Sequence, residues 1–597
     1  MYNAPVSEIA FTLKHVAGLA DVLAADAGGE LSEDLVVAIL EEAGRFAGEE
    51  VAPLNMLGDR EGARRDAQGS VTMPAGWKSV YDAWCAGGWN GLTGAPDHGG
   101  QGLPVMLQAA TFEMWNSASM AFAMGPMLTM GAIEALEAHA SDELRALYLP
   151  RLVSGEWTGT MNLTEPQAGS DLNALRTRAE PAGDGTYRIT GQKIYITYGE
   201  HDLTDNIVHL VLARLPDAPA GTRGLSLFLV PKILVEADGS LGAANDVRCA
   251  GLEHKMGIHA SPTCTMVFGD EGGAVGWLVG EENRGLACMF TMMNNARLAV
   301  GIQGLGVAEG ALQKATAYAL ERRQGRAPGA RGDGMSPIAA HPDIKRTLLA
   351  MQAWTQVARS ICLTTAQALD MARLAGDAEA RARWGARAAL LTPVAKALST
   401  DIGFEVASMG MQVHGGMGYI EETGAAQLLR DVRIASIYEG TNGIQAIDLV
   451  QRKLPMEGGA PVRALIEEIS GVAEAAGGAP TDSGLADRGL ADSGARLARA
   501  AAALRQAVDW MGAALAEGRT AEALAGATPF LRLLGTVHGG ALLIKGALAR
   551  RDDTSPAAGH RRLLARYFAT AHLGEAEALK DQVTGGAEAV VAYDPLV

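Results

Sequence analysis

The chain has 597 residues, more than one hydrophobic core normally organises, so two to four domains are expected. Its 50 Lys and Arg residues against 68 Asp and Glu residues give a formal net charge of −18. A surface of that sign repels nucleic acid and anionic lipid, which argues against a nucleic-acid-binding or membrane-surface protein.

The cysteines and the apolar segments favour a reduced cytoplasmic protein. Cysteines 85, 249, 264, 288 and 362 form no Cys-x-x-Cys pair and have no histidine at zinc-binding spacing, so no metal site is predicted. The amino terminus lacks the basic and apolar segments of a signal peptide. The apolar stretch 120–133 is too short to span a bilayer and contains Gly125 and Pro126, so we expect a buried helix–turn–helix there.

Residues 1–158 are predicted to form an amino-terminal helical domain. Within 31–51, apolar residues recur at helical spacing between acidic ones. The expected buried face consists of Leu35, Val36, Ile39, Leu40 and Ala43. The segment 96–104, PDHGGQGLP, is predicted to be a loop.

The hydrophobic period changes in residues 159–280, which are predicted to form a middle β domain. Short runs rich in β-branched residues are separated by Gly, Pro and Asp. They occupy 185–197, 206–215, 224–232 and 262–270. This pattern predicts an antiparallel sheet.

Helical periodicity resumes after Gly285, and residues 281–455 are predicted to form a second helical domain that contains a long helix at 294–323. The segment 455–461, PMEGGAP, interrupts the pattern, and an additional alanine-rich helical domain follows at 456–597. A loop is expected at 477–494, where GLADRGLAD has low complexity. The predicted fold class is therefore mainly α with a β insert.

Two motifs in the β region are suited to ligand contact. MNLTEPQAGSD, at 161–171, indicates a strand end followed by a tight loop, in which the hydroxyls of Thr164 and Ser170 can approach a ligand. In the strand KIYITYG, at 193–199, Tyr195 and Thr197 are expected on one face, with Ile194 and Ile196 on the other. Taken singly, each motif is also compatible with an ordinary turn or strand.

A third motif spans 411–445. Its HGGMG sequence offers bare backbone for a phosphate or ribityl chain, but it lacks the G-x-G-x-x-G spacing and a surrounding βαβ unit, so a nicotinamide site is not expected. GIQGLG, at 301–306, also misses that spacing and is interpreted as helix packing. IYEGTNGIQ, at 437–445, places Glu439 beside Gly440 at the start of a predicted helix that Thr441 opens.

In order and separation, these motifs resemble the acyl-CoA dehydrogenase family of flavoproteins. The resemblance covers residues of about 30–455 and includes YLPRLVSGEW, HKMGIHASPTC and YALERRQGR. It implies an amino-terminal α domain, a middle β domain and a carboxyl-terminal helical bundle, and the additional α domain resembles the long form of the family. The implied activity is FAD-dependent α,β-dehydrogenation of an acyl-CoA to the trans-2-enoyl-CoA. The subclass most similar to this chain acts on 3-(methylthio)propanoyl-CoA in dimethylsulfoniopropionate degradation; another short or medium acyl-CoA is the wider expectation.

In the family, a glutamate removes the α-proton while N5 of FAD takes the β-hydride, and the matching position is Glu439. The family's alternative position for the base is occupied here by Ala296, which cannot accept a proton. The backbone N–H of Glu439 and a ribityl hydroxyl would stabilise the enolate. Burial against flavin and acyl chain should raise the pKa of Glu439, while the positive end of the helix opened by Thr441 opposes the rise; we expect burial to prevail once substrate has expelled water.

The resemblance also implies ligand contacts. FAD contacts would come from Met161, Leu163, Thr164, Gly169, Ser170, Tyr195, Ile196, Thr197, Arg322, Gln324, Gln412, Gly415, Gly416 and Thr441. Substrate contacts would come from Ser170, Asn294, Arg297 and Gly440. Arg322 would reach the FAD of a neighbouring subunit, and the additional domain would cover the surface that shorter relatives use to form tetramers, so a homodimer is expected. Tyr195 stands where the family usually has Trp, and Gly443 replaces a frequent Gln.

Several alternatives share the expected fold. A dehydrogenase passes electrons to an electron-transferring flavoprotein, whereas an oxidase passes them to oxygen, and the sequence does not distinguish the two. A long-chain or membrane-associated enzyme would also carry an extra helical domain, but residues 456–597 contain no evident basic amphipathic helix. A non-enzymatic DNA-binding relative would need a basic carboxyl-terminal region, and here Arg alternates with Asp and Glu.

Overall fold

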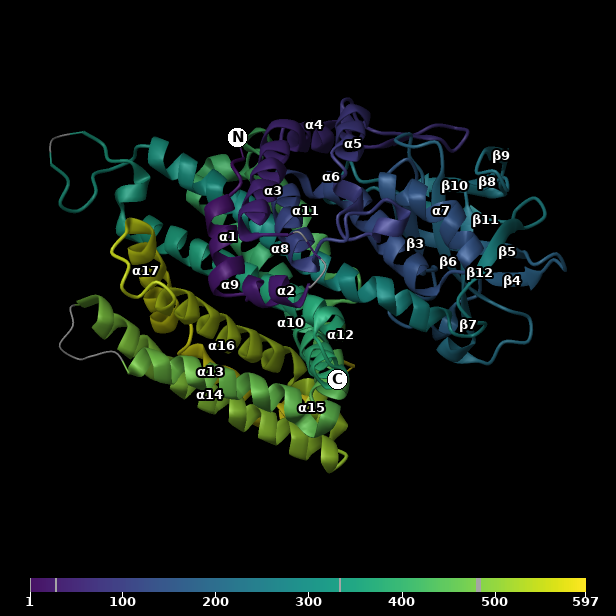
Figure 1. The fold of residues 1–597 in the computed structure, drawn as a ribbon. Helices are drawn as coiled ribbons and strands as arrows, with labels where there is room; N and C mark the ends of the chain where they lie inside the picture. Colours follow the sequence, from purple (N-terminus) through teal and green to yellow (C-terminus); the bar gives the residue numbers. More distant parts are fainter. Residues whose placement is uncertain (1, 27–28, 30, 332–333, 479–484, 597) are drawn as a thin grey trace. The chain divides into compact units, whose positions relative to one another are not determined.

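The computed structural model describes residues 2–26, 29, 31–331, 334–478 and 485–596, excluding the side chains of 293, 294 and 485–488 (Figure 1). It divides into two compact units. Unit 1 comprises 45–104 and 118–296; unit 2 comprises 2–44, 105–117 and the chain from 297 to the carboxyl terminus. The named strands of the described residues all lie in unit 1, which confirms the predicted class of a mainly α protein with a β insert.

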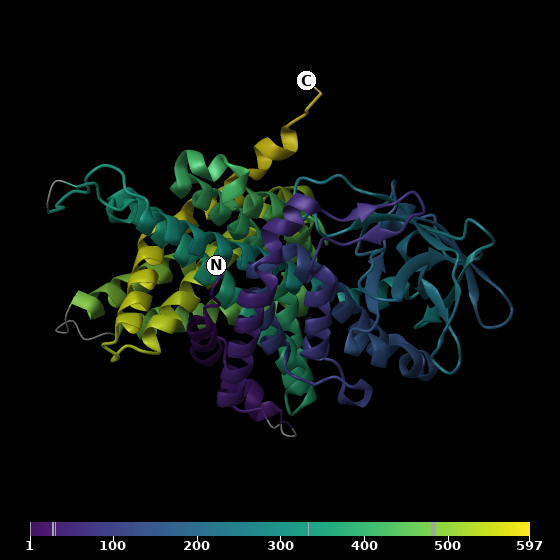
Figure 2. The same cartoon turned by 90° about the horizontal axis from the view of Figure 1, so that it is seen from above.

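The main sheet of unit 1 has the strand order β10-β11-β5-β12-β7-β6-β3, with β4 pairing to β5 and β6 (blue in Figure 2). Its strands are β3 (Thr158–Asn162), β4 (Arg178–Pro181), β5 (Tyr187–Thr197), β6 (Ile207–Arg214), β7 (Leu225–Pro231), β10 (Val247–Leu252), β11 (Thr263–Phe268) and β12 (Ala274–Val279). Small hairpins are formed by β1 (Arg64–Arg65) with β2 (Val71–Thr72), and by β8 (Ile233–Val235) with β9 (Leu241–Ala244).

The sheet is mixed, so the expectation of a purely antiparallel arrangement was wrong. The predicted runs became β5, β6, β7 and β11, but β3 pairs with β6 in parallel, with Thr158 opposite Ile207. The physical reason is the length of the connection: the whole segment between β3 and β6 intervenes, so the chain can return in the same direction. A core of Phe228, Phe268, Val211 and neighbouring residues packs on the sheet.

Unit 1 also contains helices. They are the π-turn at Ala47–Val51, α4 (Leu54–Glu61), α5 (Trp77–Ala86), α7 (Asp142–Ser154) and the later part of α6 (Val105–His139). The predicted loop at 96–104 holds a short 3-10 turn at Pro96–His98 and is otherwise irregular. The predicted turn at Gly125–Pro126 was wrong, because α6 continues through Pro126 and breaks at Ser119. Ser119 is extended, and its Oγ accepts from the Phe122 N–H at 3.4 Å, which caps the helical segment that follows.

Unit 2 is built from helices. They are α1 (Val6–His15), α2 (Leu19–Ala25), α3 (Glu33–Phe46), α9 (Pro342–Leu374), α10 (Ala378–His414), α11 (Ala425–Val432), α12 (Asn442–Asp448) and most of α8 (Gly285–Glu321). On α3, Val36, Leu40 and Ala43 are buried as predicted, but Leu35 is 44% exposed. Leu35 lies at the edge of the apolar arc, where the 100° step between residues turns it outward.

Glycines allow α8 and α10 to approach closely, which confirms that GIQGLG is a helix-packing motif. A Cβ at Gly301 would lie 2.5 Å from the Ala395 carbonyl oxygen, and one at Gly304 would lie 2.3 Å from that of Ser399. Neither position can hold a larger side chain without separating the two helices.

The carboxyl-terminal part of unit 2 consists of α13 (Ala460–Gly477), α14 (Leu485–Ala516), α15 (Thr520–Ala525), α16 (Ala527–Leu548), α17 (Pro556–Ala571), α18 (Glu575–Gly585) and α19 (Ala587–Ala592). Figure 1 shows α13, α14 and α16 side by side, and α16 also packs against α9, α10 and α12. This confirms the predicted additional helical region.

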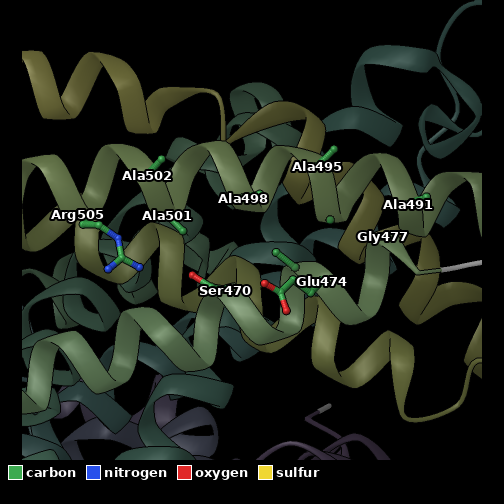
Figure 3. A pocket seen from close by; sticks show the side chains of 11 residues that line it. Ser470, Glu474, Gly477, Ala491, Ala495, Ala498, Ala501, Ala502 and Arg505 are labelled. Carbon is green, nitrogen blue, oxygen red and sulfur yellow. The ribbon is translucent and has the colours of Figure 1, made fainter.

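The predicted loop at 477–494 is too long. Residues 479–484 lie outside the described residues, and α14 already begins at Leu485. Low complexity concealed a helical period: Leu490, Ser493, Leu497, Ala500 and Leu504 are all buried at alternating spacings of three and four. Residues of α13 and α14 line a groove of about 530 Å³, mainly with Ala and Gly and with Ser470, Glu474 and Arg505 (Figure 3). None of the predicted site residues lines it.

Among the described residues, two helices are long and apolar enough to cross a membrane, Val105–His139 and Ala527–Leu548. Of their most apolar windows, 94% and 83% respectively is buried inside the protein, as in core helices.

A buried ionic cluster joins three helices of unit 2. The Arg359 guanidinium on α9 donates to Glu113 on α6, with Nε 2.9 Å from Oε1, and to Oε2 of Glu309 on α8 at 2.8 Å. All three side chains are buried, and burial raises the pKa of Glu113 while the charge of Arg359 opposes the rise. One buried guanidinium thus supplies the positive charge and the hydrogen bonds for two carboxylates in a medium of low dielectric.

We expect Arg359→Met to lower the melting temperature strongly, because removing one partner of a buried ion pair typically costs about 3–5 kcal/mol. Arg346→Met is the matched control, since Arg346 lies on the same helix but pairs with Asp343 at the exposed surface. Thermal unfolding followed by circular dichroism at a fixed scan rate compares the variants. If Arg359→Met and the control had equal melting temperatures, the ionic cluster would not make the expected contribution to the stability of the protein.

Candidate active site

Glu439 lies in a strained turn. Its φ is +54° and that of Gly440 is +82°, so two successive residues adopt the left-handed conformation that a non-glycine residue rarely takes. Such strain persists where the surrounding structure imposes it, and it gathers at functional sites. The Thr441 side chain then accepts from the Ile444 N–H at 3.2 Å and caps α12, so this residue opens the helix as predicted.

A buried lysine lies under the turn. Lys396 on α10 is fully buried, and its ammonium donates to the Gly440 carbonyl and to Oδ1 of Asn442, both at 2.9 Å. The Asn442 amide group in turn contacts α10, with Nδ2 2.7 Å from Oδ1 of Asp401 and 3.1 Å from the Ala397 carbonyl. The turn that carries Glu439 is therefore fastened to α10 by charge-assisted and amide hydrogen bonds.

Two residues of α8 complete this cluster. Arg297 is buried, with Nη1 3.8 Å from Oδ2 of Asp448, and its Nε has no hydrogen-bond partner among the described residues. The hydroxyl of Tyr438 donates to Oε1 of Gln303. Side chains from α8, α10 and α12 thus surround Glu439.

The electrostatics of Glu439 follow from this setting. The protein packed around its half-buried side chain raises the pKa of Glu439, while Arg297 and Lys396 oppose the rise. Burial also lowers the pKa of Lys396 to about 8, against the opposing effect of Glu439 and Asp401. Burial is the largest effect on the pKa of Glu439, and two cationic side chains oppose it. That burial also prevails once substrate has expelled water stays a prediction.

In unit 1, the predicted FAD residues of the 161–170 segment lie against β5. Met161 is buried in β3, while Gly169 and Ser170 are exposed. The Ile194 N–H donates to the Thr164 carbonyl at 2.9 Å, and the Lys193 ammonium donates to the Leu163 carbonyl at 2.9 Å. Leu163 and Thr164 are therefore held beside Tyr195.

The predicted alternation along 193–199 was wrong at one point. The register of β5 against β11 shifts between Cys264 and Met266, and Tyr195 has φ +61° with 60% of its surface exposed. A β-bulge inserts an extra residue, so Lys193 and Ile196 are both buried and the simple two-residue period fails. The bulge leaves the Tyr195 ring open to solvent, next to half-buried Thr197.

Glu165 organises this region and was not predicted. Its buried carboxylate accepts from the Lys193 ammonium at 2.9 Å, from the Thr177 hydroxyl at 2.6 Å and from the Arg176 N–H at 2.7 Å. Burial alone would raise its pKa, but Lys193 and these donors bring the pKa to about 2. The available signal was Lys193, a cation inside the strand sequence of 187–197, whereas Glu165 lies in a polar loop where a glutamate is not unusual.

A second cluster of predicted FAD residues lies where α8 and α10 end. The Tyr318 ring stacks on His414 at 4.4 Å between centroids, which brings the two helix ends together. Close to this pair in the chain, Arg322, Gln324, Gln412, Gly415 and Gly416 are exposed. A Cβ at Gly415 or Gly416 would meet nothing within 4 Å, so the backbone there is open to a ligand. Exposed guanidinium, amides and bare backbone suit the phosphate and adenosine part of a dinucleotide.

Within one chain these two groups of unit 2 are separate. Lys396 and Gln412 lie on the same helix, roughly 24 Å apart at a rise of about 1.5 Å per residue. Gly440, Thr441 and Arg297 belong to the Glu439 cluster, whereas Arg322 and Gly416 belong to the other. The Asn294 side chain lies outside the described residues.

Sequence reasoning missed Lys396 and Asn442. Asn442 follows Thr441 inside the quoted motif, where its role looked like that of any helix-start residue. Lys396 had a clearer signal, because it is a cation in the apolar run LLTPVAKAL of a helix. A buried lysine needs a partner, and its partner could be found only from the fold.

Family models match nearly the whole chain. They are the amino-terminal, middle and carboxyl-terminal domains of acyl-CoA dehydrogenase, at residues 35–156, 160–270 and 283–454, and an acetyl-CoA dehydrogenase carboxyl-terminal-like domain at 465–594.

A curated relative and solved structures are consistent with these family models. The chain is 46% identical to 3-methylmercaptopropionyl-CoA dehydrogenase of Ruegeria pomeroyi, over 96% of this chain and 95% of the relative. Two solved structures share its fold. Caenorhabditis elegans ACDH-11 in complex with C11-CoA has a TM-score of 0.78 at 20% identity, covering 100% of this chain and 96% of the other. An acyl-CoA dehydrogenase complexed with FAD from Bacillus anthracis has a TM-score of 0.72 at 22% identity, covering 94% and 89%.

The order of the matched domains, the nearly full-length relative and the shared fold agree with the resemblance seen in the motifs. The chain belongs to the acyl-CoA dehydrogenase family.

Proposed function

We propose that this protein is an FAD-dependent dehydrogenase that converts an acyl-CoA thioester to the trans-2-enoyl-CoA, with Glu439 as the base that removes the α-proton. The observation that carries the assignment is a glutamate in a strained turn, faced by the buried cations Arg297 and Lys396. Family membership supports both the reaction and the cofactor.

The base must satisfy two opposing demands. An α-proton of a thioester is a weak acid, so a carboxylate of raised pKa is the better proton acceptor, yet it must be ionised when the substrate binds. Burial supplies the raised pKa of Glu439, and Arg297 and Lys396 favour its ionised form. Substrate binding would exclude water and strengthen both effects.

FAD, when bound, supplies the acceptor for the hydride that leaves the β-carbon. We propose that Leu163, Thr164 and Tyr195 to Thr197 of unit 1 hold its flavin part, together with the remaining FAD residues of the 161–170 segment. Tyr195 suits this role because its ring is exposed beside a polar loop whose backbone is fixed by Lys193 and Glu165.

Glu439→Gln is expected to reduce bleaching of the bound flavin by saturated thioester at least about 100-fold, because general bases typically contribute 10² to 10⁴ in rate. Anaerobic stopped-flow absorbance measures this directly. Glu457→Gln is the matched control: Glu457 also precedes a glycine and has φ +50°, but it is exposed. Flavin bleaching by Glu439→Gln at the wild-type rate would rule out the assigned base.

We further propose a homodimer with shared FAD sites. The Arg322–Gly416 cluster is separated from the Glu439 cluster along α10, so a second chain can supply it to the cofactor of the first. Large apolar side chains near this cluster, Leu320, Met335, Met417 and Tyr419, are 48–83% exposed in one chain, as expected of a surface that a partner covers.

Co-expression of Arg322→Ala with Glu439→Gln tests this sharing. If Arg322 serves the partner's FAD, a heterodimer has one site with both residues intact, and activity returns above that of either variant alone. Activity is assayed after purification with a different tag on each chain. Mixed dimers no more active than the more active of the two variants alone would show that Arg322 and Glu439 serve the same site within one chain.

We propose 3-(methylthio)propanoyl-CoA as the substrate and an electron-transferring flavoprotein as the electron acceptor, in the cytoplasm. The support for the substrate is the name and 46% identity of the Ruegeria pomeroyi relative. The four-domain division, with limits after 158, 280 and 455, likewise stays a proposal.

We expect kcat/KM for 3-(methylthio)propanoyl-CoA to exceed that for butanoyl-CoA, and both to exceed that for palmitoyl-CoA, because a pocket that fits a five-atom chain rejects a much longer one. Steady-state assays with ferricenium measure the order. Hydrogen peroxide release in air, at a rate near that of ferricenium reduction, would instead identify an oxidase.

A further inference from the structure

Lys396 differs from every residue that the family resemblance placed in the site. Its ammonium has two hydrogen-bond partners among the described residues, the Gly440 carbonyl and Oδ1 of Asn442, and these two residues flank Thr441. Its side chain is completely removed from solvent. An ammonium group is seldom buried unless its charge and its donors are both used.

We propose that Lys396 is a positioning residue for the dehydrogenation: its hydrogen bonds to the Gly440 carbonyl and to Asn442 hold the left-handed Glu439–Gly440 turn that presents the base. This inference rests on the proposed role of Glu439 as the base.

The hydrogen bonds account for the conformation. A left-handed glutamate costs free energy, and the turn persists because neighbouring groups hold it. Lys396 fixes the carbonyl that follows Glu439, while Gln445 donates from Nε2 to the Glu439 carbonyl at 3.2 Å. Both donors act on the main chain, so the carboxylate itself stays available for a proton.

The charge accounts for the ionisation. Arg297 and, to a smaller extent, Lys396 favour the charged form of Glu439, against the effect of burial. Arg297 is partly compensated by Asp448, which lies 3.8 Å away and also pairs with Arg452 at 2.6 Å. The groups that oppose the lowering of the Lys396 pKa are Glu439 itself and Asp401, whose carboxylate also accepts from the Asn442 amide at 2.7 Å.

The charged groups around the pair come from each helix packed against it. They are Arg297 on α8, Asp401 and Glu405 on α10, Asp448 on α12 with Arg452 and Lys453 beyond it, and Arg532 on α16, and the titratable hydroxyl of Tyr438 precedes Glu439 in the chain. Lys396 is the cation of this set that also bonds the turn, so its replacement affects conformation and charge together.

Three substitutions separate these two effects. Lys396→Arg keeps the charge and the donors, Lys396→Gln keeps a donor without the charge, and Lys396→Met removes both. Lys545→Met is the control, because the Lys545 ammonium also donates to a main-chain carbonyl, that of Val16, at 2.7 Å, but away from the turn. The rate of flavin reduction by saturated thioester is measured against pH for each holoenzyme.

In the wild type, the rate should fall on acidification as Glu439 becomes protonated. Without the nearby positive charge, the pKa of Glu439 rises, so the fall should move to higher pH by about one unit or more in Lys396→Gln and Lys396→Met. Lys396→Arg and Lys545→Met should keep the wild-type position. Lys396→Met should also lower the rate at the high-pH plateau, because the turn loses its donor.

An unchanged acid limb in Lys396→Gln, or an equal shift in Lys396→Arg, overturns the inference. If Lys396→Met does not fold, the comparison of Lys396→Gln with Lys396→Arg still tests the effect of the charge, because both variants keep a polar side chain that can donate a hydrogen bond. Glu439→Gln is measured in parallel, so that a failure of the proposed base can be told apart from a failure of the Lys396 inference. If Glu439→Gln is inactive at every pH, Glu439 remains the base whatever the Lys396 variants do. If Glu439→Gln is active, Glu439 is not the base.

Discussion

The close approach of α8 and α10 is the constraint on which the candidate active site depends. Gly301, Gly304 and Gly403 leave no room for a side chain, and a Cβ at Gly403 would lie 2.5 Å from the Gly304 carbonyl oxygen. This contact places Arg297 and Gln303 of α8 near Lys396 and Thr400 of α10. Around Glu439, the chemistry therefore follows from backbone packing, because a wider helix spacing would separate the two cations from the carboxylate.

Buried charge is used in different ways in the two units. In unit 1, Glu165 and Lys193 satisfy each other and fix the loop beside Tyr195. In unit 2, Arg359 joins Glu113 and Glu309 far along the chain from the Glu439 turn. Both are closed groups whose donors and acceptors are matched, as buried ions require.

In the Glu439 cluster, by comparison, some buried polar groups have no hydrogen-bond partner among the described residues. Among the described residues, the Glu439 carboxylate forms no hydrogen bond to Arg297 or Lys396, and Arg297 and Gln445 each retain a buried polar atom that lacks a partner. Unmet polar groups beside a strained turn cost stability, and such a cost is usual where a ligand completes the set. A structural glutamate would be expected to resemble Glu165 instead.

The carboxyl-terminal helices are integrated into unit 2. A Cβ at Gly535 of α16 would lie 2.5 Å from Leu398 Cδ2, and one at Gly539 would lie 2.4 Å from Val357 Cγ1. α16 thereby packs against the same α10 that carries Lys396, and against α12 behind the Glu439 turn. Through α16, the carboxyl-terminal helices pack against the two helices that hold the Glu439 turn. Their alanine-rich sequence does not reveal this role.

The sequence by itself determined the α, β, α and additional α order, the main strands, the helix-packing role of GIQGLG and the position of Glu439 before a helix capped by Thr441. These features depend on local periodicity, turn chemistry and motif order, which neighbouring residues encode. The tertiary structure alone decided the parallel β3–β6 pair, the Tyr195 bulge, the break at Ser119 and the early start of α14. It also decided that Lys396 lies under the Glu439 turn, because a hydrogen bond between residues 44 positions apart depends on how helices pack and leaves no local pattern in the chain.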